Sequence, residues 1–161
     1  MSSFLSRLRR HKLLLAFLPA LIFLFCSVFY YEINHSFVAF CDTVFRNEIT
    51  ENTLNLHYTL ENPEILNLSD PDVSFGSMNP EVLADAFSQQ NIYLEKLFKF
   101  PKDWLSTKNR LTYDILTSAF SLQAEGEKYL LYDEPLGPSL GTQAQLPVLL
   151  AEYSFHNKKD I

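Results

Sequence analysis

The feature that most constrains this chain is an uninterrupted apolar stretch close to its N-terminus. Residues 13–31, LLLAFLPALIFLFCSVFYY, contain no charged side chain. A helix rises about 1.5 Å per residue, so a helix of this length comes close to the ~30 Å thickness of a bilayer core. The stretch therefore predicts a transmembrane helix, and a lipid bilayer is the first expected partner.

A cleaved secretory signal is the main alternative for residues 13–31. Such signals have an apolar region of roughly 7–15 residues, followed by small residues at the cleavage site. The apolar run here is longer, and the segment EINHSFVAFCD after it has no Ala-x-Ala pair. Phe40 also precedes Cys41, where lipoprotein processing requires a small residue. We therefore expect an uncleaved anchor, with a buried helix of a soluble protein as a third interpretation.

Charge is distributed unevenly on the two sides of the apolar stretch. Residues 1–12 contain the basic run RLRRHK, whereas all nineteen acidic residues of the chain follow residue 31. Because positive charge is retained on the cytoplasmic side, residues 1–12 are predicted to form a cytoplasmic tail and the remainder an extracytoplasmic body. That body, residues 32–161, carries nine basic against nineteen acidic residues, a net charge of −10. It would repel phosphate backbones, so no nucleic acid is expected as a partner.

The body has the patterning of a mainly α protein. One group of apolar residues recurs at helical spacing: Phe37, Phe40, Val44 and Phe45. This spacing predicts a separate helix over about 36–50, with Asn34 or Ser36 as its N-cap. Residues 51–60 alternate in polarity, which leaves a strand and a short helix both open until Pro63 ends either one.

Two more helices are predicted further along the body. Asn79 followed by Pro80 has the pattern of an N-cap and a proline at the first helical position. The apolar stripe of that helix is Leu83, Ala86, Phe87, Leu94, Leu97 and Phe98. Pro101 stops it, and Asp103 is the expected cap of a further helix that runs to about Lys128. The apolar positions of this further helix are Leu111, Ile115, Ala119 and Leu122.

The predicted fold class is thus mainly α, with an N-terminal transmembrane helix followed by a partial α-helical domain. The turn-rich segment DEPLGPSLGTQAQL interrupts the helices and is typical of a loop of fixed shape. Amphipathic helices need partners for their apolar stripes, and the few helices expected here could only barely cover one another.

Motifs that carry chemistry are scarce. His57 and Glu61 would share one face of a helix, which suits a metal, but a half-exposed pair without a metal is the favoured interpretation. The sequence has no His-Glu-x-x-His, no Gly-x-Ser-x-Gly and no phosphate-binding glycine loop. Cys26 and Cys41 form no Cys-x-x-Cys pattern, so neither a disulfide framework nor structural zinc is indicated. We expect no catalytic, cofactor-binding or metal-binding residue in this chain.

Three stretches of the body, FRNEITENTLNLHYTLENPE, LTYDIL and EPLGPSLGTQAQLPVLLAEYSF, resemble a bacterial family. The family is known as domain of unknown function 885, and the resemblance covers its amino-terminal part across roughly residues 37–161. The resemblance implies a location at the bacterial cell membrane and a similarity to zinc metallopeptidases. Zinc is implied only for full-length relatives, whose expected His-Glu…Pro-Gly-His segment is absent here, so no metal ligand or catalytic glutamate carries over.

On this resemblance, residues 36–161 would be the N-terminal part of a metallopeptidase-like domain, truncated after Ile161 and inactive alone. Two other functions stay open: a standalone membrane-anchored helical module that binds another protein, and one half of a split enzyme. If any residue contacts a substrate, the candidates are Gln143 and Gln145 of the GTQAQL loop, because their amides can hydrogen-bond a peptide backbone. The favoured alternative is that these glutamines brace the loop.

Overall fold

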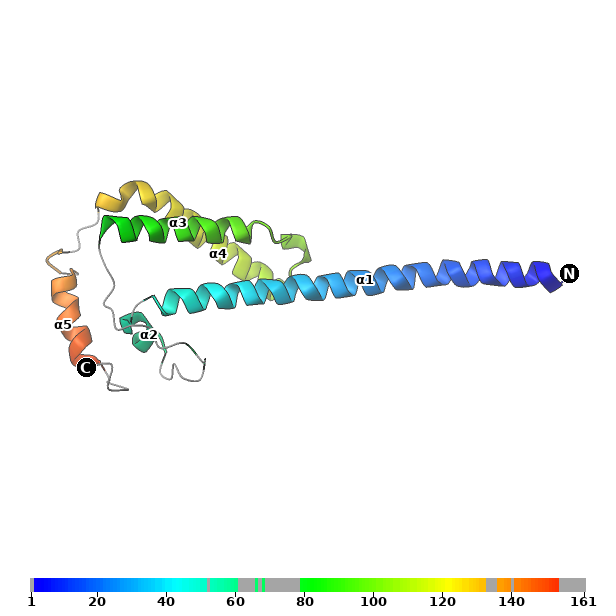
Figure 1. Cartoon of the computed structure of the whole chain (residues 1–161), viewed down its shortest axis with the longest axis horizontal. Coiled ribbons are helices and arrows are strands. Elements are labelled where there is room, and N and C mark those ends of the chain that lie inside the picture. The colour runs from blue at the N-terminus through cyan, green and yellow to red at the C-terminus, as the bar shows by residue number, and fades with distance from the viewer. Residues whose placement is uncertain are drawn as a thin grey trace.

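A computed structural model describes residues 2–51, 53–60, 66, 68, 79–132, 136–139 and 141–153. All regular structure in this part of the chain is helical, which confirms the mainly α fold class. The first helix, α1 (Ser2–Ile49), extends from a smaller helical body as a long rod (Figure 1). The body is built around the C-terminal part of α1 from four shorter helices: α2 (Thr53–Thr59), α3 (Pro80–Leu97), α4 (Thr107–Gly126) and α5 (Thr142–Glu152).

α1 is continuous through the point at which two helices were expected. The helix predicted over about 36–50 is present as the last part of α1, but Asn34 and Ser36 lie inside α1, so its predicted start and cap are wrong. The physical reason is that no glycine or proline occurs between Ala20 and Ile49, so nothing interrupts the helical hydrogen bonds. Pro19 does lie inside α1, and proline is more frequent in transmembrane helices than in soluble ones.

The segment that left strand and helix open forms the short helix α2. Leu56 is buried, and the Tyr58 hydroxyl donates a hydrogen bond to the Leu149 carbonyl of α5. This short helix therefore links α1, which it follows directly, to α5. The period-2 pattern of its sequence covers too few residues to separate a strand from a short helix.

α3 begins as the sequence predicts. The Asn79 side chain accepts a hydrogen bond from the Glu81 backbone N–H at 3.1 Å, and Pro80 takes the first helical position. The cap of α4 is Ser106, whose Oγ accepts from the Asn109 backbone N–H at 3.2 Å. The predicted cap, Asp103, is wrong because it lies within the short 3-10 helix η2 (Lys102–Trp104) between α3 and α4.

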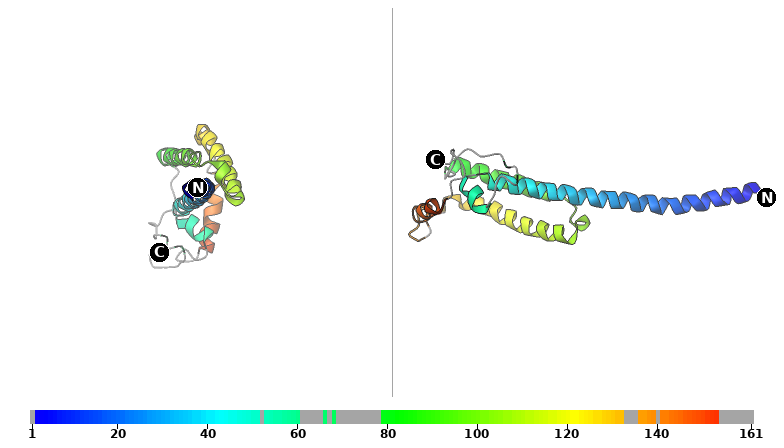
Figure 2. Two further views of the ribbon diagram at one scale, coloured as in Figure 1. Left: turned by 90° about the vertical axis from the view of Figure 1, so that its right-hand side faces the viewer. Right: turned by 90° about the horizontal axis from the view of Figure 1, so that it is seen from below.

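α3 and α4 form an antiparallel hairpin that lies along the C-terminal part of α1. Figure 2 shows this arrangement end-on, with both helices on one side of α1 and α2 and α5 on the other. The buried residues of this three-helix contact are Phe37, Val44, Tyr93, Leu97, Leu105 and Phe120. Phe37 packs edge-on against Phe100 with ring centroids 5.3 Å apart, and Tyr93 packs against Phe120 at 5.9 Å. The body thus has one small aromatic core, to which α1 contributes a full face.

The face of α4 that packs is not the one its apolar stripe suggests. Leu111, Ile115 and Leu122, three of the apolar positions expected for this helix, are 64%, 59% and 71% exposed. The opposite side of α4 provides the core, through Tyr113, Leu116 and buried Phe120. α4 is apolar on two faces, and helical spacing cannot say which of them finds a partner.

α4 also ends sooner than predicted. Its last residue is Gly126, and the 3-10 helix η3 (Glu127–Tyr132) takes the place of its expected last turn at Lys128. Glycine at the end of an α-helix lowers its helical preference, and a tighter 3-10 turn is a common ending.

Candidate functional site

The N-terminal part of α1 projects away from the body as a bare apolar rod (Figure 1). From Leu18 onward, where its side chains are described, the large ones are exposed, with Phe23 at 75%, Phe25 at 70% and Leu18 at 61%. Only 6% of its most apolar window is buried inside the structure. By length and composition, the part of α1 from Leu18 to Ile49 is a candidate membrane span near the N-terminus. It is the one such helix in the part of the chain that the structure describes.

Asn34 joins α1 to the start of α4. Its Oδ1 accepts hydrogen bonds from the Ser106 backbone N–H at 2.7 Å and from Asn109 Nδ2 at 2.9 Å. Its Nδ2 donates to the carbonyls of Trp104 at 3.0 Å and Tyr30 at 2.8 Å. A helix N-terminus leaves backbone N–H groups without intrahelical partners, so Asn34 acts as a cap supplied by another helix.

Trp104 lies at the tip of the α3–α4 hairpin, beside the point where α1 leaves the body. Its ring meets the Phe29 ring edge-on, with centroids 5.3 Å apart, and it stays 40% exposed. The sequence did not predict the contact of Asn34 with another helix, and it did not mark Trp104 as a contact residue. The available signal was a lone tryptophan in the segment FKFPKDW, flanked by lysines and a proline.

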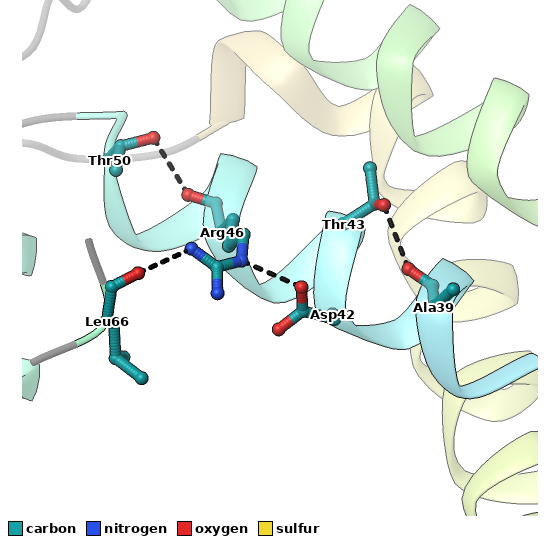
Figure 3. A network of polar contacts seen from close by, with 6 residues as sticks. All are labelled: Ala39, Asp42, Thr43, Arg46, Thr50 and Leu66. Carbon is teal, nitrogen blue, oxygen red and sulfur yellow. Dashed lines mark hydrogen bonds and ion pairs between the residues drawn. The ribbon is translucent and has the colours of Figure 1, made fainter. Parts of the chain in front are cut away.

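A polar network closes the other end of α1, as Figure 3 shows. Arg46 Nε pairs with Asp42 Oδ2 at 2.7 Å, and the same guanidinium donates to the Leu66 carbonyl at 2.8 Å. The Thr50 hydroxyl donates to the Arg46 carbonyl, also at 2.8 Å. The Arg46–Asp42 pair is partly exposed, and exposed ion pairs of this spacing contribute little, about 0.3–0.5 kcal/mol. The network holds Leu66 against the last turns of α1.

A small open pocket of about 160 Å³ lies between the end of α1 and α3. Most of the residues around it are of polar type, although the surface they turn to the pocket is mainly apolar: Asn47, Glu48, Glu51, Ala86, Gln89, Gln90 and Tyr93. Gln90 Nε2 donates to Glu48 Oε1 at 2.9 Å, and Asn47 Nδ2 donates to the Tyr93 hydroxyl at 2.8 Å. Ligand sites commonly measure roughly 300–1,000 Å³, so this pocket is too small for a substrate, and its polar groups serve the contact between the helices.

Among the residues that the structure describes, Glu48 and Cys41 are the two whose pKa the body clearly shifts. Burial raises the pKa of the Glu48 carboxyl above its ordinary value; the Gln90 hydrogen bond opposes this and the nearby charge of Glu51 adds to it. Burial also raises the pKa of the Cys41 thiol, against a smaller lowering effect of a backbone hydrogen bond. A thiol with a raised pKa offers little thiolate, so Cys41 is poorly suited to be a nucleophile.

The structure places Gln143 and Gln145 on the first turns of α5 rather than on a loop. Both side chains are exposed, and Gln143 Nε2 donates to the Gly137 carbonyl at 2.7 Å. Gly141, just before the helix, is buried, and a Cβ there would overlap the backbone of Gly137. The contact of Gln143 supports the bracing role that was favoured for it. Contact of either glutamine with a substrate stays a prediction.

Metal-binding side chains are not gathered in the part of the chain that was searched. Within it, no three His, Cys, Asp or Glu side chains lie close enough together to hold a metal. The His57–Glu61 pair lies outside the side chains that the structure describes. The expectation of a chain without catalytic or metal-binding residues therefore stays a prediction.

Comparisons with protein-family models, with curated proteins and with solved structures find no match. The resemblance to the domain of unknown function 885 family, and the zinc it implies for full-length relatives, likewise stay predictions.

Proposed function

We propose that this protein is a membrane-anchored helical module, which carries a protein-binding helix face at the membrane surface. In this proposal residues 13–31 of α1 cross the bilayer, residues 1–12 stay in the cytoplasm, and the body lies outside. The observation that carries the proposal is the contrast along α1, whose N-terminal part is exposed and apolar while its C-terminal part is packed in the body.

The packing of α1 supports the placement of the membrane along it. Phe37 is 1% exposed and Val44 7%, because both lie against α3 or α4. That part of the helix already has a protein partner, whereas the exposed rod from Leu18 to Phe25 has none. Burying such apolar side chains contributes about 1.5–3 kcal/mol each, so a bilayer offers the rod the burial that the body does not.

The exposed stripe on α4 supports a role in protein binding. Leu111, Ile115 and Leu122 share one face of α4 and lie outside the core. An apolar stripe at this spacing is what a partner helix buries when it packs against α4. The pocket between α1 and α3 is small, and the exposed apolar face of α4 is the kind of surface that a binding module offers a partner.

Vesicle flotation followed by alkaline carbonate extraction tests the anchor. The unmodified full chain should float with vesicles and resist extraction. The double variant Leu18→Arg with Phe25→Arg should be released, because two arginines near a bilayer centre cost roughly 5–7 kcal/mol on insertion.

The matched control places the same change on the exposed face of α4, through Ile115→Arg with Leu122→Arg. Its spacing and exposure match those of the α1 pair, and this variant should stay anchored. Release of the unmodified chain by carbonate, or equal release of both double variants, would contradict the anchor.

The family resemblance gives a second candidate, the N-terminal portion of a metallopeptidase-like protein. It rests on the three stretches that resemble the family, and it predicts that the missing metal site comes from another polypeptide segment. Equilibrium dialysis of the full chain against zinc should then show no stoichiometric binding. Tight binding of one zinc ion per chain, abolished by His57→Ala, would instead place a metal site in this chain.

A further inference from the structure

The tip of the α3–α4 hairpin, residues 96–110, differs in charge from the rest of the body. It contains five of the nine basic residues of the body: Lys96, Lys99, Lys102, Lys108 and Arg110. Asp103 is the one acidic residue within this segment. A body with a net charge of −10 thus concentrates positive charge at one end.

This end of the body faces the apolar rod. α3 runs toward the rod, η2 meets α1, and α4 runs back again (Figure 1). The Trp104–Phe29 ring contact and the Asn34 hydrogen bonds fix the tip beside the last residues of the uncharged stretch 13–31. Any bilayer that α1 crosses over this stretch would therefore have its surface at the level of the tip.

The tip also exposes aromatic side chains beside its lysines. Phe98 is 57% exposed and Trp104 40%, and the span contributes Tyr30 and Tyr31 at 44% and 65% at the same level of α1. Tryptophan and tyrosine favour the boundary between lipid and water, because an apolar ring and a polar group can each meet their preferred medium. Lysines next to them suit anionic headgroups, which attract basic residues close to a membrane surface.

We propose that the hairpin tip is a lipid-binding surface, which inserts Trp104 at the headgroup level of a bilayer rich in anionic phospholipid. Lys99 and Lys108 contact the phosphates, whereas Lys102 is paired with Asp114 at 2.6 Å. The body is then held at the membrane by α1 and by the tip together. This inference rests on the proposed anchor, since α1 sets the height of the tip. The bound chemistry is that of an anionic lipid surface.

The sequence itself supplies the probe, because Trp104 is the single tryptophan of the chain. The full chain is reconstituted into phosphatidylcholine vesicles with about one quarter phosphatidylglycerol, a composition with a negative surface potential. A spin label on the lipid headgroup should lower Trp104 emission about twofold, as expected for a ring at the interface. Iodide in the water should quench it much less.

A reporter at the far end of the hairpin provides the matched control. In the double variant Trp104→Phe with Leu122→Trp, the single tryptophan sits on the last turns of α4, at a site 71% exposed in the unmodified chain. Its emission should be quenched by iodide and not by the headgroup label. Equal quenching of Trp104 and this reporter by iodide, in a chain that still resists carbonate, overturns the lipid-binding tip and leaves the anchor standing.

Charge reversal separates the lysines from the tryptophan. Lys99→Glu with Lys108→Glu should reduce the headgroup quenching of Trp104 in the anionic vesicles to the level found in phosphatidylcholine alone. Lys128 lies in η3, away from the tip, so Lys128→Glu should leave the headgroup quenching of Trp104 unchanged. Unchanged quenching in the double reversal would overturn the role of anionic headgroups. Loss of carbonate resistance by the unmodified chain would overturn the anchor and this inference together.

Discussion

The two halves of α1 have the same secondary structure and opposite environments. Phe23 in the N-terminal half is 75% exposed, whereas Phe37 in the C-terminal half is 1% exposed and packs against rings of the hairpin. The helix between them has no break. One apolar helix can therefore meet two different partners, and the change from one to the other needs only a different set of neighbours.

The boundary between the halves is marked by polar contacts rather than by a change in the helix. The Asn34 side chain hydrogen-bonds to the hairpin, where it caps α4. Trp104 packs against Phe29, which precedes Asn34 on α1. A continuous helix with a fixed contact at this level transmits the orientation of its membrane part to the body, because helices are stiff over this length. The same substitution should therefore have different effects on the two sides of the boundary.

The largest effect should come from removing the same ring in each half. Phe37→Ala should lower the free energy of unfolding of the body by about 3–5 kcal/mol, the usual cost of emptying a buried phenylalanine site. Phe23→Ala should change it by less than about 0.5 kcal/mol. Denaturant unfolding of the full chain in mild detergent, followed by circular dichroism, measures both. Equal effects of the two changes would contradict the assigned core.

A smaller effect should come from the polar residue at the boundary. Asn34→Ala leaves the Ser106 N–H and the Trp104 carbonyl without this partner, at a cost of about 1–3 kcal/mol. Ser27→Ala is the matched control in the other half. The Ser27 hydroxyl donates its hydrogen bond to the Phe23 carbonyl of the same helix, so its loss breaks no contact between helices. The same unfolding experiment should show almost no change for the control. A neutral Asn34→Ala would mean that the cross-helix cap is not formed in solution.

The smallest effect concerns pH and lies at the end of α1. Burial raises the pKa of Glu48 in the folded body, so the folded state holds its proton more tightly than the unfolded state does. The contribution of this group is therefore most favourable below its ordinary pKa of about 4.5 and is lost as pH rises through the raised value. Glu48→Gln keeps an acceptor for Gln90 and should stabilise the body at neutral pH relative to the unmodified chain.

Unfolding curves recorded at acid and at neutral pH check this sign. The gain from Glu48→Gln should fade toward acid, where both chains carry a neutral side chain. Gln89→Glu, at another position lining the same pocket, controls for the general effect of charge there. A gain from Glu48→Gln that grows toward acid would have the wrong sign.

Part of this fold follows from the sequence because local chemistry decides it. The start of α3 is one case, since Asn79 and Pro80 carry their own capping signal, and the apolar stretch of α1 is another. The α4 cap depends on more than residue type. Asp103 and Ser106 are both good caps by residue type, and the 3-10 turn of η2 decides between them.

The remaining features depend on neighbours that a local pattern does not contain. Asn34 is of a residue type that favours the N-cap position, and it does cap a helix, but that helix is α4 rather than its own. α4 has apolar residues on two faces, and its contact with α3 and α1 selects the face of Phe120 over that of Leu111. The candidate surface at the hairpin tip could not be predicted from the sequence either. Its lysines and Trp104 suggest a lipid contact only because the fold places them beside the end of the apolar stretch.

Amide hydrogen exchange of the full chain in lipid nanodiscs tests whether one unbroken helix passes from the membrane into the core of the body. Such a helix should show slow exchange along α1 from Leu18 to about Val44, including the amides between Tyr31 and Phe37. Fast exchange confined to that short segment would show two helices joined by a break, and it would contradict the unbroken helix.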